Sequence, residues 1–374
     1  MKILIVASPW LGGSGTVGIQ LAKELAKEHQ VYFLSFDFPE RAGRESKNLV
    51  FYNFTTFSYA LFPYPLYTES LAEKLFDIVK NHDIDIIHAH YSLVFGTSAI
   101  LAKQFLKNIG RKVPAVVTIH GTDALGFDPS KGKHYNFENL NSFIVQESDQ
   151  VTVASSYMRD FVASEYASEG KLAVIPNFID KSACSGIQPR SFEERDTIVH
   201  ISNFRKVKRP MAAARVFEKL YNEKEYRKTR FVFIGEGPLE AEVKHYLEDR
   251  QVPAEFLGKM KEEEIFKWLA VSKVIVLPSE FENFPLVLLE ALVMGTPQVA
   301  ACVGGMSDVT EDKVTGFLVN SDGRLEDEIA AKIMELEDQE LWNYMSNNSL
   351  ERVKKFDTSE VVPQYLEIYK KVIR

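Results

Sequence analysis

The segment Glu282-Asn-Phe-Pro-Leu-Val-Leu-Leu-Glu290 follows the short apolar run Val274-Ile-Val-Leu-Pro278. The run is typical of a buried parallel strand, and the segment after it predicts a helix, with Asn283 as a candidate cap and Pro285 in its first turn. A helix N-terminus can seat a phosphate, and carboxylates accept hydrogen bonds from sugar hydroxyls. The segment therefore favours a nucleotide-sugar site. The alternative is that both glutamates are solvated groups on an ordinary amphipathic helix.

The composition is that of an ordinary globular protein. The 374 residues are 45% hydrophobic and 26% charged, with a net charge of −8, and their number suggests two or three domains. The acidic balance argues against a nucleic-acid groove, and no apolar run approaches the ~20 residues of a membrane helix. Cys184 and Cys302 alone fit a reducing compartment and exclude a disulfide framework. The start does not resemble a signal peptide, so we expect a cytoplasmic protein.

The N-terminal pattern is strand, glycine loop and helix. An apolar strand at residues 2–7 is followed by the loop and by a helical pattern to Glu28. The spacing G-x-G-x-x-G is made by Gly13, Gly15 and Gly18. Asp37 stands where a ribose-binding acid of a dinucleotide fold would lie, which taken alone predicts an NAD-dependent oxidoreductase. Any Gly-rich turn into a helix can hold a phosphate, and a close-packed turn without a ligand also stays open.

Strands and helices then alternate. We expect strands at 31–36, 49–54, 84–88, 115–119, 151–154 and 172–175, and helices near 68–80, 96–107, 138–147 and 156–165. Repeated βα units predict a parallel sheet covered on both faces, with ligands at the carboxyl ends of the strands. Three motifs are expected there, in one crevice: the glycine loop, His88-Ala-His90-Tyr91 and His120-Gly-Thr-Asp123.

A second βα series follows the linker-like segment 177–196. Its strands are expected at 197–201, 230–234, 254–257, 274–277, 297–301 and 316–319, and its helices near 210–221, 238–250, 261–270, 286–294, 325–337, 340–354 and 358–372. The expected fold class is α/β, with two doubly wound Rossmann-like domains facing a central cleft. We place the first domain at 1–178 and the second at 179–357.

A basic loop opens the second domain. Ser202-Asn-Phe-Arg-Lys-Val-Lys-Arg-Pro210 carries four cations: Arg205, Lys206, Lys208 and Arg209. A diphosphate leaving group needs fixed positive charge as the glycosidic bond breaks. The alternative is a solvated basic loop. Gly235-Glu-Gly-Pro238, Gly258-Lys-Met260 and Gly304-Gly305 end further strands and are candidate backbone walls for a base or a phosphate.

The histidines allow more than one interpretation. His88 and His90 share a strand face, but no third metal ligand is linked to them, so we favour a histidine packed in the core with Tyr91 lining the cleft. His120 and Thr122 follow an apolar strand, where an imidazole and a hydroxyl could meet a sugar or an acceptor. A His120 satisfied by backbone groups is an equally open alternative.

Along nearly its whole length the chain resembles the retaining family 4 glycosyltransferases of GT-B fold. The glycine loop, the basic loop, the G-E-G-P turn and E-x7-E at 282–290 carry this resemblance. Several segments also resemble a narrower group within this family, the N-acetylglucosaminyl-L-malate synthases of bacillithiol biosynthesis. These segments are Gly12-Gly-Ser-Gly-Thr-Val-Gly18, His88-Ala-His-Tyr91, Thr118-Ile-His-Gly-Thr-Asp123 with Asp128-Pro-Ser130, Asn177-Phe-Ile-Asp180 and His200-Ile-Ser-Asn-Phe-Arg-Lys-Val-Lys-Arg209.

The resemblance implies transfer of N-acetylglucosamine from a UDP-sugar to L-malate. The catalytic residues it implies are His120, Arg205, Lys208 and Glu282. Nucleotide-sugar binding is implied for Gly13, Ser14, Lys208, Gly258, Lys259, Phe284, Leu286 and Glu290, and acceptor binding for Ser14, Tyr91, Thr122 and Arg205. A phosphate oxygen takes the acceptor's proton in this family, so we expect neither a metal nor another cofactor. The helix at about 358–374 is expected to pack back onto the first domain.

The sequence also departs from the family pattern. Pro285 replaces a glycine, the segment 131–139 is longer than expected, and Ser142 and Cys302 stand where we expect arginines. A dicarboxylate acceptor prefers cations, so a lipid-linked or polysaccharide acceptor is the main alternative. No amphipathic helix shows the basic, aromatic-rich face of a membrane-docking segment, which weakens the lipid alternative.

Two other classes of protein remain as alternatives. An NAD-dependent oxidoreductase would leave Glu282, Glu290 and the loop 202–210 without a task. A non-catalytic sugar-nucleotide sensor or scaffold is the other. For partners we expect small-molecule substrates, and a homo-oligomer stays open.

Overall fold

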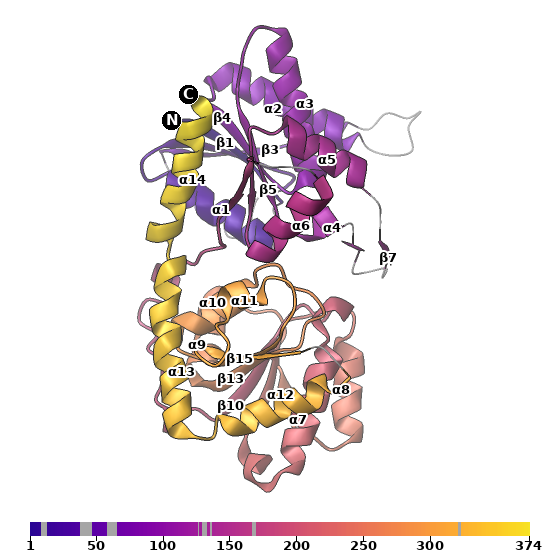
Figure 1. Cartoon of the computed structure of the whole chain (residues 1–374), viewed down its shortest axis with the longest axis vertical. Helices are drawn as coiled ribbons and strands as arrows, with labels where there is room; N and C mark the ends of the chain where they lie inside the picture. Colours follow the sequence, from indigo (N-terminus) through magenta and orange to yellow (C-terminus); the bar gives the residue numbers. More distant parts are fainter. Residues whose placement is uncertain are drawn as a thin grey trace. The chain divides into compact units, whose positions relative to one another are not determined.

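The structure, a computed structural model, describes residues 1–8, 13–37, 47–57, 66–125, 127–128, 133–134, 137–166, 170–320 and 323–374. The chain forms two compact units (Figure 1). The first contains Met1–Asp128, Lys133–Asn177 and Thr358–Arg374, and the second contains Phe178–Asp357. These limits lie beside the expected boundaries at 178 and 357, and the last helix belongs to the first unit.

The first unit is built on a seven-stranded parallel sheet with the order β3-β2-β1-β4-β5-β8-β9. Its strands are β1 (Lys2–Val6), β2 (Gln30–Ser35), β3 (Leu49–Asn53), β4 (Ile86–His90), β5 (Ala115–Ile119), β8 (Gln150–Val153) and β9 (Leu172–Val174). Its helices are α1 (Gly13–Leu25), α2 (Tyr67–His82), α3 (Thr97–Asn108), α4 (Thr122–Leu125), α5 (Glu138–Glu147), α6 (Ser156–Tyr166) and α14 (Thr358–Ile373). A small antiparallel pair, β6 (Phe127–Asp128) and β7 (Lys133–His134), lies apart from the main sheet.

Helices cover the first sheet, so its central strands are buried on both faces. Every residue of β4 and β5 is buried. Helices α1 and α14 pack against each other, and α3 packs against α2 and α5 (Figure 1). The C-terminal helix α14 is tied to the sheet at Tyr369, whose hydroxyl lies 2.6 Å from Nδ1 of His88 in β4.

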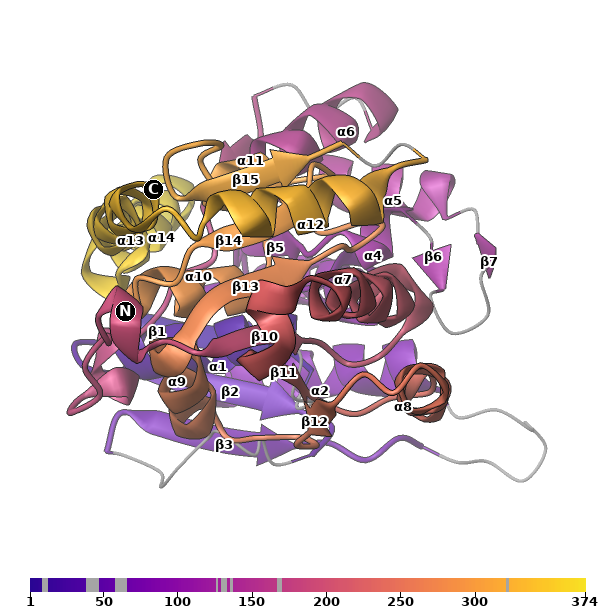
Figure 2. The same ribbon diagram turned by 90° about the horizontal axis from the view of Figure 1, so that it is seen from below.

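The second unit contains a six-stranded parallel sheet with the order β12-β11-β10-β13-β14-β15. Its strands are β10 (Thr197–Ile201), β11 (Arg230–Ile234), β12 (Ala254–Phe256), β13 (Ser272–Leu277), β14 (Gln298–Ala301) and β15 (Gly316–Val319). Its helices are α7 (Pro210–Asn222), α8 (Glu240–Asp249), α9 (Glu262–Val271), α10 (Leu286–Val293), α11 (Met306–Val309), α12 (Leu325–Glu335) and α13 (Gln339–Arg352). Helix α7 packs against α8 and α12, and α10 packs against α9 and α13 (Figure 2).

Both sheets reverse their strand order beside their first strand. In the first unit the reversal lies between β1 and β4, and in the second unit between β10 and β13. In open α/β sheets, ligands bind outside the carboxyl ends of the strands at such a point. A ligand site is therefore expected among the residues that follow β1, β4, β10 and β13.

Three local predictions are wrong. Strand β4 ends at His90 rather than at His88, because both histidine side chains find room inside the sheet. Helix α1 begins at Gly13, so Gly13, Gly15 and Gly18 lie in its first turns and not in a loop before it. Pro285, not Asn283, is the N-cap of α10, and no side chain caps that helix. Trp10 and Gly12 of the glycine loop, Pro129 and Ser130, and part of the segment 131–139 lie outside the described residues.

Candidate active site

The reversal point of the second sheet carries an ion pair. Lys208 Nζ lies 2.6 Å from Glu282 Oε1, and the hydroxyl of Ser279 donates a 2.8 Å hydrogen bond to the same oxygen. Lys208 comes from the loop after β10, and Glu282 from the loop after β13. The side chain of Glu282 is only 7% exposed, so the alternative of a solvated surface acid is wrong for this residue.

The basic loop takes its shape from His200 in β10. His200 Nδ1 lies 2.9 Å from the carbonyl oxygen of Val276, so this nitrogen donates, and Nε2 accepts from the hydroxyl of Ser202 at 2.8 Å. The amide of Phe204 in turn donates to Ser202 Oγ. Burial lowers the pKa of His200 to about 4, so the ring is neutral and keeps this arrangement at neutral pH.

Arg205 stands next in this loop. Within the described ranges its buried Nε has no hydrogen-bond partner. Buried guanidinium N–H groups are rarely left without an acceptor, because their desolvation is costly. An anionic ligand beside the loop would supply one.

The G-E-G-P turn holds the loop from the other side. A Cβ at Gly235 would lie 1.8 Å from the carbonyl oxygen of Ser202, and one at Gly237 would lie 2.0 Å from that of Asn203. Only glycine permits such an approach. Glu236 reaches the next strand end, where its Oε1 accepts the backbone N–H of Lys259 at 3.2 Å, beside Gly258 with φ +68. These residues form backbone walls around the carboxyl ends of β11 and β12.

Gly304 and Gly305 position Glu282. The amide of Gly305 donates to the carbonyl oxygen of Glu282 at 2.9 Å, and a Cβ at Gly304 would lie 2.1 Å from that oxygen. The sequence placed these glycines at a strand end but did not indicate that they contact Glu282. The contact depends on two loops that meet only after the sheet has formed.

Helix α10 carries the remaining donor-side candidates. Glu290 is buried in its second turn, at 7% exposure, so it too is not a surface acid. Phe284 packs edge-on against Phe356 with ring centroids 5.5 Å apart, so its ring is part of the core and a ligand could meet only its backbone. Leu286 is the first residue of the helix.

In the first unit, the carboxyl ends of β4 and β5 bring two histidines together. His90 Nδ1 lies 3.0 Å from His120 Nε2, and the two rings stack with centroids 5.2 Å apart. The ring of Tyr91 lies 4.9 Å from that of His120. A neighbouring side chain, that of His90, therefore holds the ring of His120.

Asp123 organises this end of the first sheet, a role that sequence reasoning missed. Its Oδ1 accepts the amides of His120 and Gly121 at 3.1 and 2.9 Å, and its Oδ2 accepts the amide of Ser92 at 2.7 Å. The last bond stabilises the turn at Tyr91, which has φ +80. Burial raises the pKa of Asp123, although these hydrogen bonds act in the opposite direction.

The three histidines of this cluster are neutral at neutral pH. Burial lowers the pKa of His90 to about 3 and lowers the pKa values of His88 and His120 well below 6.5. Both His88 and His90 are fully buried. The sequence predicted that one of these two histidines packs in the core, and the structure places both there.

The remaining acceptor-side candidates lie on neighbouring elements. Gly13 and Ser14 are the first two residues of α1, and Thr122 is an exposed residue at the start of α4. Ser142 is half-buried in α5, and Cys302 is exposed after β14.

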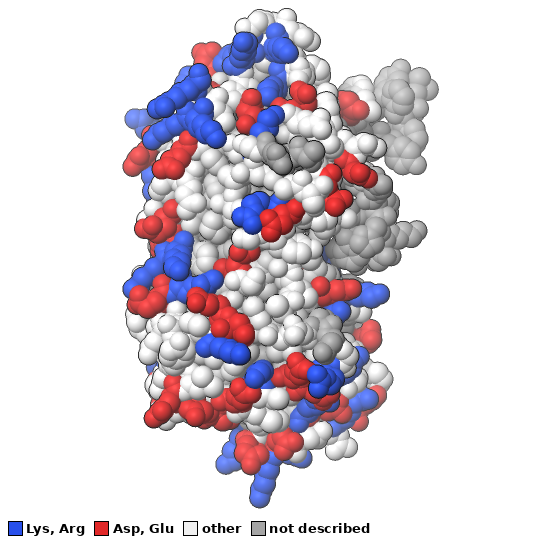
Figure 3. All heavy atoms as spheres, in the orientation of Figure 1, with Lys and Arg blue, Asp and Glu red and all other residues white. Residues whose placement is uncertain are grey.

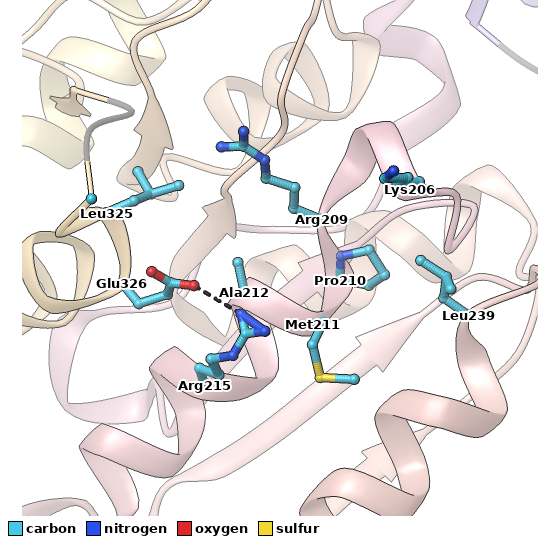
Figure 4. A pocket seen from close by; sticks show the side chains of 10 residues that line it. Lys206, Arg209, Pro210, Met211, Ala212, Arg215, Leu239, Leu325 and Glu326 are labelled. Atoms are coloured by element: carbon cyan, nitrogen blue, oxygen red, sulfur yellow. Dashed lines mark hydrogen bonds and ion pairs between the residues drawn. The ribbon is translucent and has the colours of Figure 1, made fainter. Parts of the chain in front are cut away.

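A separate pocket of about 350 Å³ lies in the second unit (Figure 4). Lys206 and Arg209 of the basic loop line it, together with Arg215, which pairs with Glu326 at 3.0 Å. Lys208 and Arg205 are not among its lining residues.

The surface charge, the grouping of possible metal ligands and the helix lengths were compared with those of nucleic-acid-binding, metal-binding and membrane-spanning proteins. On the face drawn in Figure 3, Lys and Arg are interspersed with Asp and Glu, unlike the basic stripe of a nucleic-acid-binding protein. Within the described ranges, no three His, Cys, Asp or Glu side chains are grouped as a metal site requires. In the same part of the chain, no helix is both long and apolar enough to span a bilayer.

Known proteins that are similar to this chain in sequence or in fold are glycosyltransferases and related sugar-transferring enzymes. A family model of glycosyltransferase family 4 matches residues 11–183, and one of glycosyl transferases group 1 matches residues 187–352. An N-acetyl-alpha-D-glucosaminyl L-malate synthase of Bacillus anthracis is 33% identical, with 100% of this chain and 98% of that protein covered. A UDP-Gal:alpha-D-GlcNAc-diphosphoundecaprenol alpha-1,3-galactosyltransferase of Escherichia coli is 24% identical, over 79% of this chain and 78% of that protein. The solved sucrose-phosphate synthase of Thermosynechococcus elongatus has the same fold, with a TM-score of 0.80, 18% identity and coverage of 99% and 98%.

Proposed function

We propose that this chain, which belongs to the family 4 glycosyltransferases of GT-B fold, transfers N-acetylglucosamine from UDP-N-acetylglucosamine to the hydroxyl of L-malate. The chemical identity of the sugar and the acceptor follows the name of the full-length relative that is 33% identical. UDP as the carrier follows the family resemblance and the name of the galactosyltransferase.

The observation that carries the donor half of the proposal is the Lys208–Glu282 pair at the reversal point of the second sheet. We assign Lys208 and Arg205 to the diphosphate, where fixed charge offsets the charge that builds up as the bond to C1 breaks. Glu282 would accept hydrogen bonds from the sugar hydroxyls and Glu290 from the ribose hydroxyls. Gly258 and Lys259 would contribute backbone contacts to the nucleotide.

We assign the acceptor half to the first unit. His120 would contact the transferred sugar near the reacting carbon, and Tyr91, Thr122 and Ser14 would face the acceptor. In the step that we propose, the bond from C1 to the phosphate oxygen breaks as the acceptor oxygen bonds to C1 on the same face. The acceptor's proton passes to the phosphate oxygen of the departing UDP. The step consumes no oxidant and needs no metal.

A lipid-linked acceptor is the second candidate, favoured by the relative whose acceptor is a diphosphoundecaprenol. Ser142 and Cys302 also stand where we expected arginines, so fewer cations are present to bind a dicarboxylate acceptor. Arg205 could still supply a charge-assisted hydrogen bond, worth about 1.5–3 kcal/mol.

The test incubates purified protein with UDP-N-acetylglucosamine and a panel of hydroxy acids, and follows UDP release and product mass. We expect release that depends on L-malate, with little on D-malate or simple alcohols, and the same rate after treatment with a chelator. Transfer to an oligosaccharide or a lipid diphosphate, without malate dependence, would reject L-malate and keep the donor assignment. A rise in melting temperature with NAD, and none with the UDP-sugar, would reject the donor itself.

A further inference from the structure

The hydrogen bond between His90 and His120 joins two neutral imidazoles. Nδ1 of His90 and Nε2 of His120 are 3.0 Å apart, so one ring donates its proton and the other accepts. A neutral imidazole carries one N–H, and the bond made by one nitrogen determines which nitrogen carries the proton. The direction of this single bond therefore fixes the tautomers of both rings.

The second nitrogen of His90 decides the direction. Nε2 of His90 is buried and, among the described residues, has no hydrogen-bond partner. The edge of the ring at Cδ2, the carbon bonded to Nε2, faces α1, because a Cβ at Gly18 would lie 3.6 Å from both Cγ and Cδ2. Gly18 lies in the second turn of α1, near the helix end that carries positive partial charge.

Two arrangements are possible. If His120 donates, the proton of His90 must sit on Nε2, where a buried N–H meets no acceptor among the described residues. If His90 donates, its Nε2 keeps a lone pair, which the positive end of α1 favours. The second arrangement leaves no N–H of His90 unsatisfied.

We propose that His90 is a positioning residue that donates Nδ1–H to Nε2 of His120 and so places the proton of His120 on Nδ1. His120 is then a neutral hydrogen-bond donor and not a base. This inference rests on the proposed function for its consequence, which is that Nδ1–H of His120 donates to an oxygen of the UDP-sugar.

Nuclear magnetic resonance of the whole chain labelled with nitrogen-15 histidine tests the tautomer directly, since protonated and bare ring nitrogens resonate far apart. His120→Asn assigns the His120 signals, and His245→Gln, at an exposed histidine of α8, controls for unspecific changes. We expect a proton on Nδ1 and a bare Nε2 for His120, and a shift of the Nδ1 signal when UDP-N-acetylglucosamine is added. A proton on Nε2 of His120 would overturn the proposal.

Two variants test the consequence. His90→Phe keeps a ring in the core but removes the donor, and we expect the proton of His120 to leave Nδ1 and kcat to fall about 10- to 100-fold. In His90→Asn the side-chain N–H can stand in for Nδ1–H, so the tautomer and part of kcat should return. A His90→Phe protein that folds, loses the tautomer and keeps wild-type kcat would reject the positioning role. If no acceptor supports turnover, the proposed function fails, while the tautomer and its shift with the UDP-sugar still decide this inference.

Discussion

Lys208 Nζ and Glu282 Oε1 are 2.6 Å apart, although the two residues are separated by 74 positions in the sequence. Each follows a strand beside the reversal point of the second sheet, so the parallel topology brings them together. The pair fixes the ammonium group before any substrate is present. Electrostatic catalysis depends on charges that need no rearrangement during the reaction, and we propose that this pairing supplies such a charge.

Replacing Lys208 by alanine is expected to lower kcat about 10²- to 10³-fold, because its charge matters most as the leaving group becomes negative. The KM for the UDP-sugar should change less. Steady-state UDP release measures both constants. Lys206→Ala is the matched control, because Lys206 lies in the same loop but lines the separate pocket. Equal kcat values for Lys208→Ala and the wild type would remove Lys208 from the mechanism.

Glu290→Gln is expected to weaken donor binding about tenfold, with a smaller effect on kcat. An amide offers one acceptor oxygen where the carboxylate offers two, and loss of one good hydrogen bond costs about 1–1.5 kcal/mol. Titration calorimetry with UDP-N-acetylglucosamine measures the affinity. Glu280→Gln is the control, since Glu280 is an exposed acid near the same helix. An unchanged affinity in Glu290→Gln would place the ribose elsewhere.

Gly304→Ala should impair both stability and donor binding. Gly304 has φ +53, and the added Cβ would lie 2.1 Å from the carbonyl oxygen of Glu282, so the loop that carries Glu282 must move. Backbone strain of this kind costs about 1–3 kcal/mol. Thermal unfolding reports the stability, and calorimetry with the UDP-sugar reports the site. Gly323→Ala, where the added Cβ meets no atom of the described residues within 4 Å, should change neither.

The order of strands and helices could be predicted from the sequence because buried parallel strands and amphipathic helices have different apolar periods. Strands such as Thr197–Ile201 and Gly316–Val319 lie where the pattern placed them. Errors concern element ends. The strand was predicted to end at His88, with His90 beyond it, because histidine is rarely fully buried. Contacts with Tyr369 and Thr118 for His88, and with His120 for His90, make their burial favourable.

Candidate site residues could be found from the sequence where they follow a strand, but their pairings could not. Nothing in the sequence links Gly304 to Glu282, or Asp123 to Ser92, because each contact joins loops from different strands. Asp123 was visible beside His120, yet its backbone acceptor role depends on the turn at Tyr91. Side-chain contacts of this kind follow from the tertiary fold and not from a local pattern.

The buried histidines also make stability depend on pH, with a definite sign. Burial holds the folded-state pKa values of His88, His90 and His120 below 6.5, while the unfolded chain titrates near about 6.5. Below that pH the unfolded state binds more protons, so their stabilisation is full above it and is lost as pH falls toward the folded pKa values. Asp123 has the opposite sign, because its raised pKa stabilises the folded state at low pH and this contribution is lost as pH rises.

We therefore expect the free energy of unfolding of the first unit to fall between about pH 7 and about pH 5, by up to ~1.4 kcal/mol per pH unit for each buried histidine. His90→Phe removes one of these groups, so its unfolding free energy should decrease less steeply over this range. Urea unfolding at a series of pH values, followed by nuclear magnetic resonance signals of the first unit, measures the two slopes. His245→Gln, at an exposed position, should keep the wild-type slope. Because the effect of Asp123 is present in every variant, it cancels in the comparison, and equal slopes for His90→Phe and the wild type would show that His90 does not contribute to the acid sensitivity.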